Sequence, residues 1–128
     1  MITSSSKAEH IMWYSIYTVG DIDIDQEHAN IDFMLSALPA ELGEPQRAAL
    51  EHLINVTIQH FPNEELIAGE RGYKMTDKHL AKHQQLTKEL QVIKQSLQNP
   101  ETSLQSIPGM LQDILKAHIL EFDRFLIP

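Results

Sequence analysis

The stretch "HFPNEELIAGERGYKMTDKHLAKH", from His60 to His83, decides how this chain folds. Glycines in its middle separate two segments that each place polar residues at helical spacing. Residues four apart lie on nearly the same face of an α-helix, so His60 and Glu64 share one face of the first segment. His79 and His83 share one face of the second in the same way. These faces are the ones that should be buried, and imidazoles there require an explanation.

Outward from this stretch, proline, glycine and capping residues divide the chain into an N-terminal arm and four helices. The arm covers about residues 1–21 and carries Trp13, Tyr14 and Tyr17. We expect Trp13 to pack the arm onto the helices. Short connections make consecutive helices antiparallel neighbours. The sequence therefore predicts an all-α fold, an antiparallel up-down-up-down four-helix bundle, in a single domain of residues 1–128. The predicted helices cover about residues 23–38, 45–68, 77–97 and 108–126.

Local signals set these boundaries. "DIDIDQEH" offers Asp23 or Asp25 as the N-cap of the first helix, and Gly69 is expected to end the second. Thr76 is a candidate cap for the third helix. Pro62 lies inside the second helix, where it removes a backbone donor and should kink the helix.

Each predicted helix carries histidine in its inward stripe, where residues three or four apart are otherwise mostly apolar. Antiparallel alternation brings the starts of the first and third helices to the same end of the bundle as the ends of the second and fourth. Five histidines and at least one carboxylate should therefore converge at one level of the core. They are His28, His60, Glu64, His79, His83 and His118.

Convergence of five imidazoles points to metal ions. A single inward histidine is usually a hydrogen-bonded core residue, but five packed together would repel when protonated and leave donors unmet when neutral. Metal ions take the lone pairs instead, and five histidines exceed what one tetrahedral zinc site uses. With two bridging carboxylates they suit two six-coordinate ions that lack one ligand, and iron fits such nitrogen and oxygen donors. Helical geometry favours Glu121 as the second carboxylate, whereas Asp123 follows the edge of the inward stripe.

Composition excludes several other functions. The formal charge of −8 argues against binding nucleic acid or an anionic membrane surface. The chain has no cysteine, which excludes disulfides and thiolate sites. No segment has the length of a membrane span or the pattern of a signal peptide, so we expect no membrane insertion and a cytoplasmic location.

At this point the chain resembles the hemerythrins, in particular the single-domain bacterial ones, over roughly residues 13–125. The resemblance rests on Trp13 and on five short motifs. The motifs are "GDIDIDQEH" up to His28, "HFPNEE" at 60–65, Gly72-Tyr73, "HLAKH" at 79–83 and "HILEFD" at 118–123. Three positions depart from the family's usual pattern, namely Pro62, Ala68 and Lys74.

The resemblance implies a non-haem diiron centre that reversibly binds dioxygen for storage, delivery or buffering. His79, His83 and His118 would bind one iron, and His28 and His60 the other. Glu64 and Asp123 would bridge the two ions beside a solvent-derived oxo or hydroxo bridge. The family pattern thus selects Asp123 rather than Glu121, and it leaves an open position for dioxygen on the iron held by two histidines.

Other functions stay open at this stage. The alternatives are an oxygen or redox sensing module, a weak diiron oxidase or peroxidase, and a histidine-rich zinc site. Ferritin-like enzymes use paired Glu-x-x-His motifs, which this chain lacks at the relevant places, so we expect no enzyme activity. A protein partner or electron donor cannot be named from the sequence. Glu65 is expected to be solvated rather than to support the site.

Overall fold

The computed structural model describes residues 17–128, and these form an all-helical bundle with no strand among them. Four α-helices make up the bundle, and two 3-10 turns accompany them. The α-helices are α2 (Ile22–Ser36), α3 (Arg47–Arg71), α4 (Asp77–Ser96) and α5 (Ile107–Glu121). The turns are η1 (Glu44–Gln46) and η2 (Asp123–Phe125). The predicted packing of Trp13 lies outside the described residues. Tyr17, the first of the described residues, is buried.

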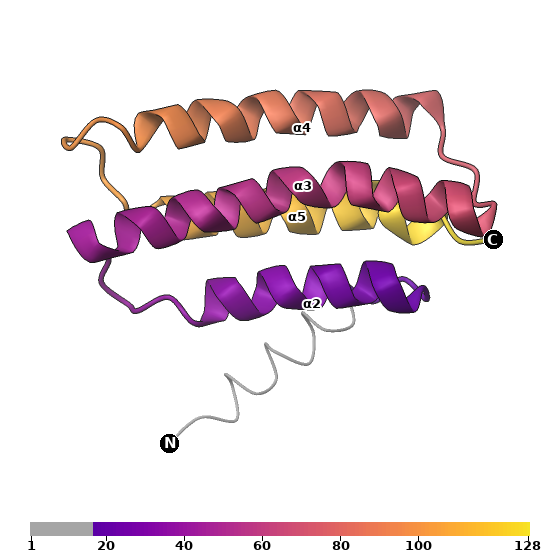
Figure 1. Cartoon of the computed structure of the whole chain (residues 1–128), viewed down its shortest axis with the longest axis horizontal. Coiled ribbons are helices and arrows are strands. Elements are labelled where there is room, and N and C mark those ends of the chain that lie inside the picture. The colour runs from indigo at the N-terminus through magenta and orange to yellow at the C-terminus, as the bar shows by residue number, and fades with distance from the viewer. Residues whose placement is uncertain (1–16) are drawn as a thin grey trace, which may run out of the picture.

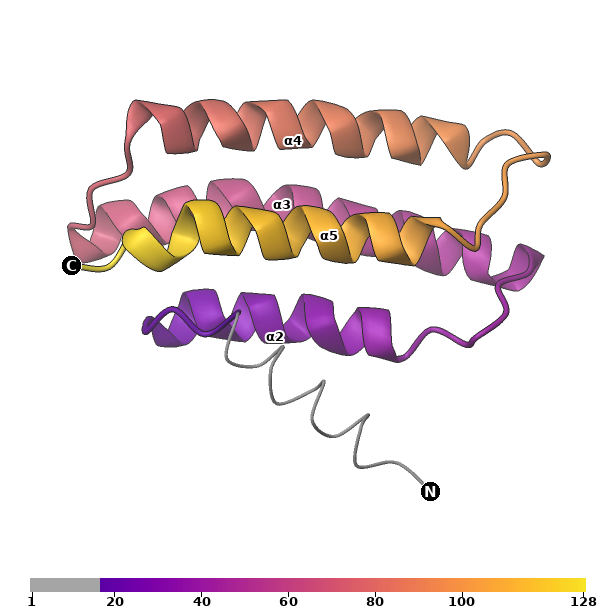
Figure 2. The same cartoon turned by 180° about the vertical axis from the view of Figure 1, so that it is seen from behind.

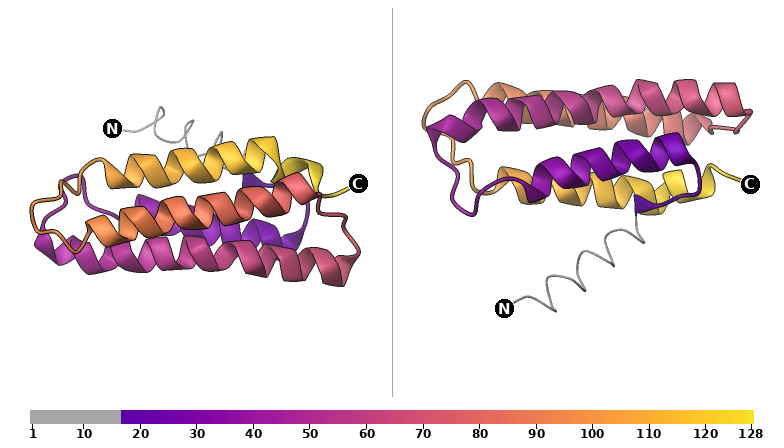
Figure 3. Two further views of the ribbon diagram at one scale, coloured as in Figure 1. Left: turned by 90° about the horizontal axis from the view of Figure 1, so that it is seen from above. Right: turned by 60° about the horizontal axis from the view of Figure 1, so that its bottom comes forward.

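Successive helices run in opposite directions, as the colours in Figure 1 and the reverse view in Figure 2 show. The N-terminal ends of α2 and α4 therefore lie at the same end of the bundle as the C-terminal ends of α3 and α5. Figure 3 shows from two further sides that the four helices lie alongside one another. The predicted fold class, an antiparallel four-helix bundle, is confirmed.

Two apolar clusters of buried residues fill the bundle. The larger runs through most of its length and includes Leu50, Leu90 and Leu111. The smaller consists of Ile24, Ala68 and Leu126. Within residues 17–128, no helix combines the length and apolar character that crossing a membrane requires.

Two helix ends differ from the predicted capping pattern. The N-cap of α2 is Asp21, not Asp23 or Asp25, and its carboxylate accepts the backbone N–H groups of Asp23 and Ile24. Helix α3 continues past Gly69 to Arg71, because Gly72 (φ 74°) supplies the left-handed conformation that ends it. Thr76 does cap α4, since its hydroxyl accepts the N–H of His79 at 3.1 Å.

The helix predicted to reach Leu126 was extended too far. Helix α5 ends at Glu121, because Phe122 (φ −128°, ψ −59°) leaves the helical region and η2 follows. Phe125, which lies within the predicted helix, falls in η2 instead and is 74% exposed. Pro62 does not end its helix, because α3 is continuous across it and the Pro62 side chain is exposed.

The Asp21 carboxylate joins three segments at this end of the bundle. Besides capping α2, it accepts the Tyr73 hydroxyl at 2.8 Å and the Arg71 Nε–H at 3.1 Å. Burial alone would raise the pKa of Asp21. The Tyr73 hydroxyl, the two backbone N–H groups and the Arg71 charge outweigh it and hold that pKa below its usual range.

We expect Asp21→Asn to lower the free energy of unfolding at pH 7 by about 1–3 kcal/mol, because the amide can still cap α2 but places N–H groups against two donors. A lowered folded-state pKa contributes stability above the unfolded value and loses it as the pH falls through the folded value. The difference from wild type should therefore shrink below about pH 4. Urea unfolding of both proteins at pH 7 and pH 3 measures it.

Asp113→Asn, at an exposed position on α5, is the matched control and should change stability little. A variant at Asp21 that is as stable as wild type at pH 7 would show that this carboxylate contributes nothing net.

Candidate metal centre

All the residues predicted to bind metal meet inside the bundle, near the end that holds the smaller apolar cluster. Every helix contributes at least one of them, and η2 contributes the last. Each is at most 3% exposed. They are His28 from α2, His60 and Glu64 from α3, His79 and His83 from α4, His118 from α5 and Asp123 from η2.

These side chains form two groups that could each hold an ion, and within a group the candidate ligand atoms all lie within 4.8 Å of one another. One group contains three histidines and the other contains two. Both contain Glu64 and Asp123, so the two groups share their carboxylates. The first group is Glu64, His79, His83, His118 and Asp123, and the second is His28, His60, Glu64 and Asp123.

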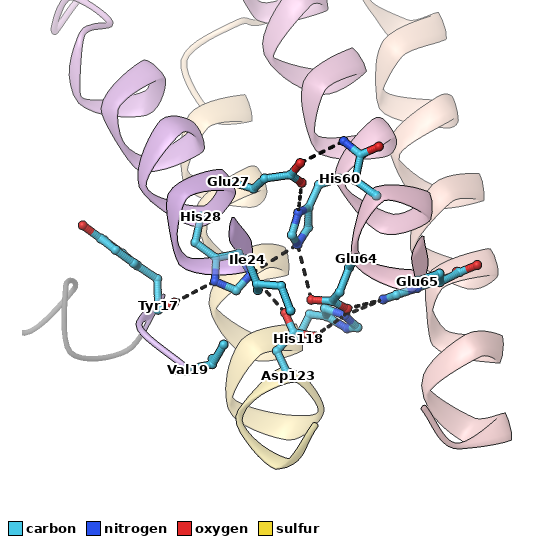
Figure 4. A network of polar contacts seen from close by, with 12 residues as sticks. Tyr17, Val19, Ile24, Glu27, His28, His60, Glu64, Glu65, His118 and Asp123 are labelled. Carbon is cyan, nitrogen blue, oxygen red and sulfur yellow. Dashed lines mark hydrogen bonds and ion pairs between the residues drawn. The ribbon is translucent and has the colours of Figure 1, made fainter. Parts of the chain in front are cut away.

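The imidazoles turn their Nε2 atoms inward. In the group with three histidines, His118 Nε2 lies 3.0 Å from His83 Nε2 and 3.3 Å from His79 Nε2. In the other group, the Nε2 atoms of His28 and His60 are 3.2 Å apart. Figure 4 shows His28 from α2, His60 and Glu64 from α3, His118 from α5 and Asp123 from η2 directed toward one another.

The carboxylates lie among these nitrogens. Glu64 Oε1 is 3.0 Å from His83 Nε2 and 3.1 Å from His79 Nε2. Glu64 Oε2 is 3.6 Å from His60 Nε2, so the two oxygens of this side chain face different groups. Asp123 does the same, with Oδ1 3.0 Å from His118 Nε2 and Oδ2 3.2 Å from His28 Nε2.

Acceptors on the outer side of three rings fix the position of the ring proton. His28 Nδ1 lies 2.7 Å from the Tyr17 carbonyl oxygen, which can only accept a hydrogen bond. His60 Nδ1 lies 2.7 Å from Glu27 Oε1 and His83 Nδ1 lies 2.8 Å from Glu65 Oε2. Nδ1 therefore carries the proton in each ring, and the neutral ring presents an Nε2 lone pair to the interior.

Lone pairs aimed at one another need a proton or a metal ion between them. When both rings are neutral and protonated at Nδ1, the facing Nε2 atoms of His28 and His60 cannot hydrogen bond to each other, and His83 Nε2 faces a carboxylate oxygen. A metal ion turns this repulsion into coordination, and Nδ1–H bonded to an acceptor is the usual state of a metal-bound histidine. The residues present thus fit a metal site.

Electrostatics lead to the same requirement. Burial by itself would lower the pKa of His60, but hydrogen bonds to Glu27 and Glu64 and the charges of Glu64 and Asp123 raise it to about 10. Burial would likewise lower the pKa of His79, but the Asp123 and Glu64 carboxylates outweigh burial and raise that pKa to about 9. The carboxylates at the centre create a negative potential that protons or metal ions must neutralise.

The pKa values of the two carboxyl groups shift in the opposite direction, downward. Burial would raise the pKa of Glu64, but hydrogen bonds from the surrounding histidines, His118 foremost, hold it well below its usual range. Burial would raise the pKa of Asp123 in the same way, but hydrogen bonds with His118, His28 and His79 lower it. Both groups are therefore anionic ligands over the neutral pH range.

Three buried side-chain nitrogen or oxygen atoms in the described part of the chain have no hydrogen-bond partner: Glu64 Oε2, Asp123 Oδ2 and His118 Nδ1. Buried polar atoms are rarely left unsatisfied. Two of the three are the carboxylate oxygens that face the group containing His28 and His60, where an ion would satisfy them.

Aromatic rings pack against the group with three histidines. The Phe61 ring stacks on His83 with ring centroids 4.8 Å apart, and it meets His118 edge-on at 5.5 Å. The Phe122 ring lies 5.2 Å from His79 and 5.5 Å from His118. These contacts fix the ring orientations and keep the surroundings apolar.

The structure brings Asp123 into the cluster and leaves Glu121 exposed. Extrapolating an ideal helix favoured Glu121, and the helix break at Phe122 is why that geometric argument was wrong. Glu65, expected to be solvated, instead contacts His83. Sequence reasoning did not find Glu27, because its contact with His60 depends on how α2 and α3 are aligned.

Comparison with known proteins gives one consistent result. A bacteriohemerythrin from Pseudomonas paraeruginosa (strain DSM 24068 / PA7) is 26% identical over 118 residues, covering 89% of this chain and 77% of that protein. A bacteriohemerythrin from Stenotrophomonas maltophilia (strain R551-3) is 28% identical over 113 residues, covering 85% and 74%. No family model matches the chain, and no solved structure matches it. Similarity over most of its length, together with the histidine and carboxylate cluster, relates this chain to the hemerythrin family as a hemerythrin-like metal-binding protein.

Proposed function

We propose that this protein holds two iron ions, joined by an oxo or hydroxo bridge, and binds dioxygen reversibly. The observation that carries the proposal is the division of the cluster into two groups that share both carboxylates but differ in their number of histidines. Shared carboxylates are what a bridged pair of ions requires, and nitrogen and oxygen donors without thiolate suit iron.

Counting donors leaves one position open. His79, His83 and His118, with two bridging carboxylates and the solvent bridge, complete six ligands at one ion. His28 and His60 with the same bridges supply five at the other. When bound in its reduced form, the iron pair supplies electrons that hold dioxygen reversibly at this open position.

The chain's own residues favour binding over catalysis. Phe61 and Phe122 cover the group with three histidines. Ile24 and Ile119 are fully buried at the same end of the bundle. Apolar walls of this kind exclude water and slow the loss of electrons from a reduced site. We therefore propose a carrier or buffer of dioxygen rather than an enzyme, and a cytoplasmic location remains a prediction.

The visible absorption spectrum of the purified protein tests this proposal, recorded after reduction, after exposure to air and after removal of oxygen. Metal analysis is made on the same sample. We expect about two irons per chain, because the two groups form two sites. We also expect a charge-transfer band that appears with oxygen and disappears without it.

Other outcomes separate the alternatives. Two irons that pass directly to a stable diferric spectrum would contradict reversible carriage and support redox sensing or oxidase chemistry. Zinc alone in protein isolated from iron-supplied cells would contradict the diiron centre.

A further inference from the structure

Two carboxylates outside the proposed ligand set contact the cluster from opposite sides. Glu27 Oε1 is 2.7 Å from Nδ1 of His60, and Glu65 Oε2 is 2.8 Å from Nδ1 of His83. Figure 4 shows Glu27 reaching His60 from α2, and Glu65 on the far side of Glu64. Each contacts a histidine of a different group, so one carboxylate supports each half of the centre.

In His28 and His118, the Nδ1 atom has no carboxylate partner within residues 17–128. Contact with a carboxylate outside the ligand set is therefore specific to His60 and His83. His28 Nδ1 meets the neutral carbonyl oxygen of Tyr17 at 2.7 Å. His118 Nδ1 has no hydrogen-bond partner among the described residues. The negative charge behind the ligands is therefore confined to one histidine in each group.

Both carboxylates border solvent, and a second hydrogen bond holds Glu27 in place. Asn63 Nδ2 donates to Glu27 Oε2 at 2.9 Å, which orients that carboxylate toward His60. The Glu27 side chain is 28% exposed and borders a cavity of about 160 Å³ between α2 and α3. The Glu65 side chain is 39% exposed and borders a groove of about 320 Å³ between α3 and α4.

The two carboxylate ligands alone do not balance the charge of two divalent ions. Neutral imidazoles contribute none, so Glu64, Asp123 and a hydroxo bridge would offer three negative charges against four positive ones. Glu27 and Glu65 supply further negative charge directly behind the ligands. Because the ligands themselves are almost fully buried, an uncompensated charge at the centre is costly.

We propose that Glu27 and Glu65 are paired positioning residues that hold His60 and His83 in the metal-binding tautomer and balance the charge of two divalent ions. This inference rests on the proposed diiron function. It assigns one supporting carboxylate to each ion, and it does not depend on whether the bound irons carry oxygen.

Glu27→Gln and Glu65→Gln test the proposal, because glutamine keeps an oxygen that accepts the Nδ1–H but removes the charge. We expect each variant to weaken Zn²⁺ binding about tenfold, at the lower limit for partners of metal ligands, since both groups are partly exposed. Competition against a chromophoric chelator measures this affinity. If the two groups act on separate ions, each site of the double variant should lose about tenfold, so that the overall constant for binding both ions falls about a hundredfold.

The reduction potential of the iron-loaded protein is the second measurement. Removing a negative charge favours the more reduced state, so each variant should have a higher midpoint potential. A tenfold change in this equilibrium corresponds to about 59 mV for one electron. A role in folding alone would leave the potential unchanged, which makes this measurement specific to charge balance.

Glu51→Gln is the matched control, since Glu51 is a half-buried glutamate on α3 more than two turns from His60. It should match wild type in Zn²⁺ affinity and potential. The proposal is overturned if Glu27→Gln and Glu65→Gln both bind Zn²⁺ within twofold of the Glu51→Gln control and have the same midpoint potential as that control. Should wild type bind zinc but fail to bind oxygen, the proposed function fails while the Zn²⁺ comparison still decides this inference.

Discussion

Replacing Glu64 by glutamine is expected to reduce the iron content of the purified protein from about two ions per chain to one or none. Glu64 belongs to both groups, with Oε1 3.0 Å from His83 Nε2 and Oε2 3.6 Å from His60 Nε2. Glutamine preserves the volume but removes the charge, and its amide nitrogen cannot coordinate a cation. Metal analysis and iron titration measure the change, which should exceed about a hundredfold in affinity because even supporting residues cost 10–100-fold.

Glu70→Gln controls for the chemistry of the change, because Glu70 lies on the same helix but is exposed. Circular dichroism should show equal helix content in both variants. Two tightly bound irons in Glu64→Gln would contradict the role of this carboxylate as a bridge.

Removing the metal is expected to lower the midpoint of thermal unfolding by about 10 °C or more. Binding to the folded state alone stabilises it by about 2.7 kcal/mol per site when the free ligand is at a hundred times its Kd, and this centre offers two sites. In this size range, each kcal/mol shifts the midpoint by about 2–8 °C. Thermal scans before and after dialysis against a chelator test this, with metal analysis to verify removal.

A control must show that the chelator lowers the unfolding midpoint by removing metal from this centre. Glu64→Gln provides that control, because this variant should have little metal to lose. Its midpoint should therefore change much less on dialysis than that of wild type. A wild-type protein that loses both ions yet unfolds within about 2 °C of the loaded form would show that the empty bundle is equally stable.

The fold and the histidines could be predicted because they depend on local periodicity. Spacings of three and four residues define the inward stripe, and antiparallel connections determine which helix ends meet. No further information was needed to bring His28, His60 and His118 to one level of the core. The comparisons with known proteins agree with the family resemblance that the same motifs carry.

The carboxylates were harder to predict, because their positions depend on contacts between elements. Asp123 was chosen by resemblance, since an ideal helix turns it away from His118, and only the break at Phe122 accounts for its position. Glu27 and Glu65 contact histidines on neighbouring helices, so their roles depend on how the helices are aligned. The N-cap of α2 was missed for the same reason, because Asp21 is selected by Arg71 and Tyr73.

The helix break at Phe122 also determines when the centre can form during protein synthesis. Both groups require Asp123, which follows the break, and one of them requires His28 from the first described helix. A chain still emerging from the ribosome therefore lacks one of the two proposed bridging carboxylates until almost all of the described residues have been made. The complete set of proposed ligands thus joins the first and the last of the described helical elements.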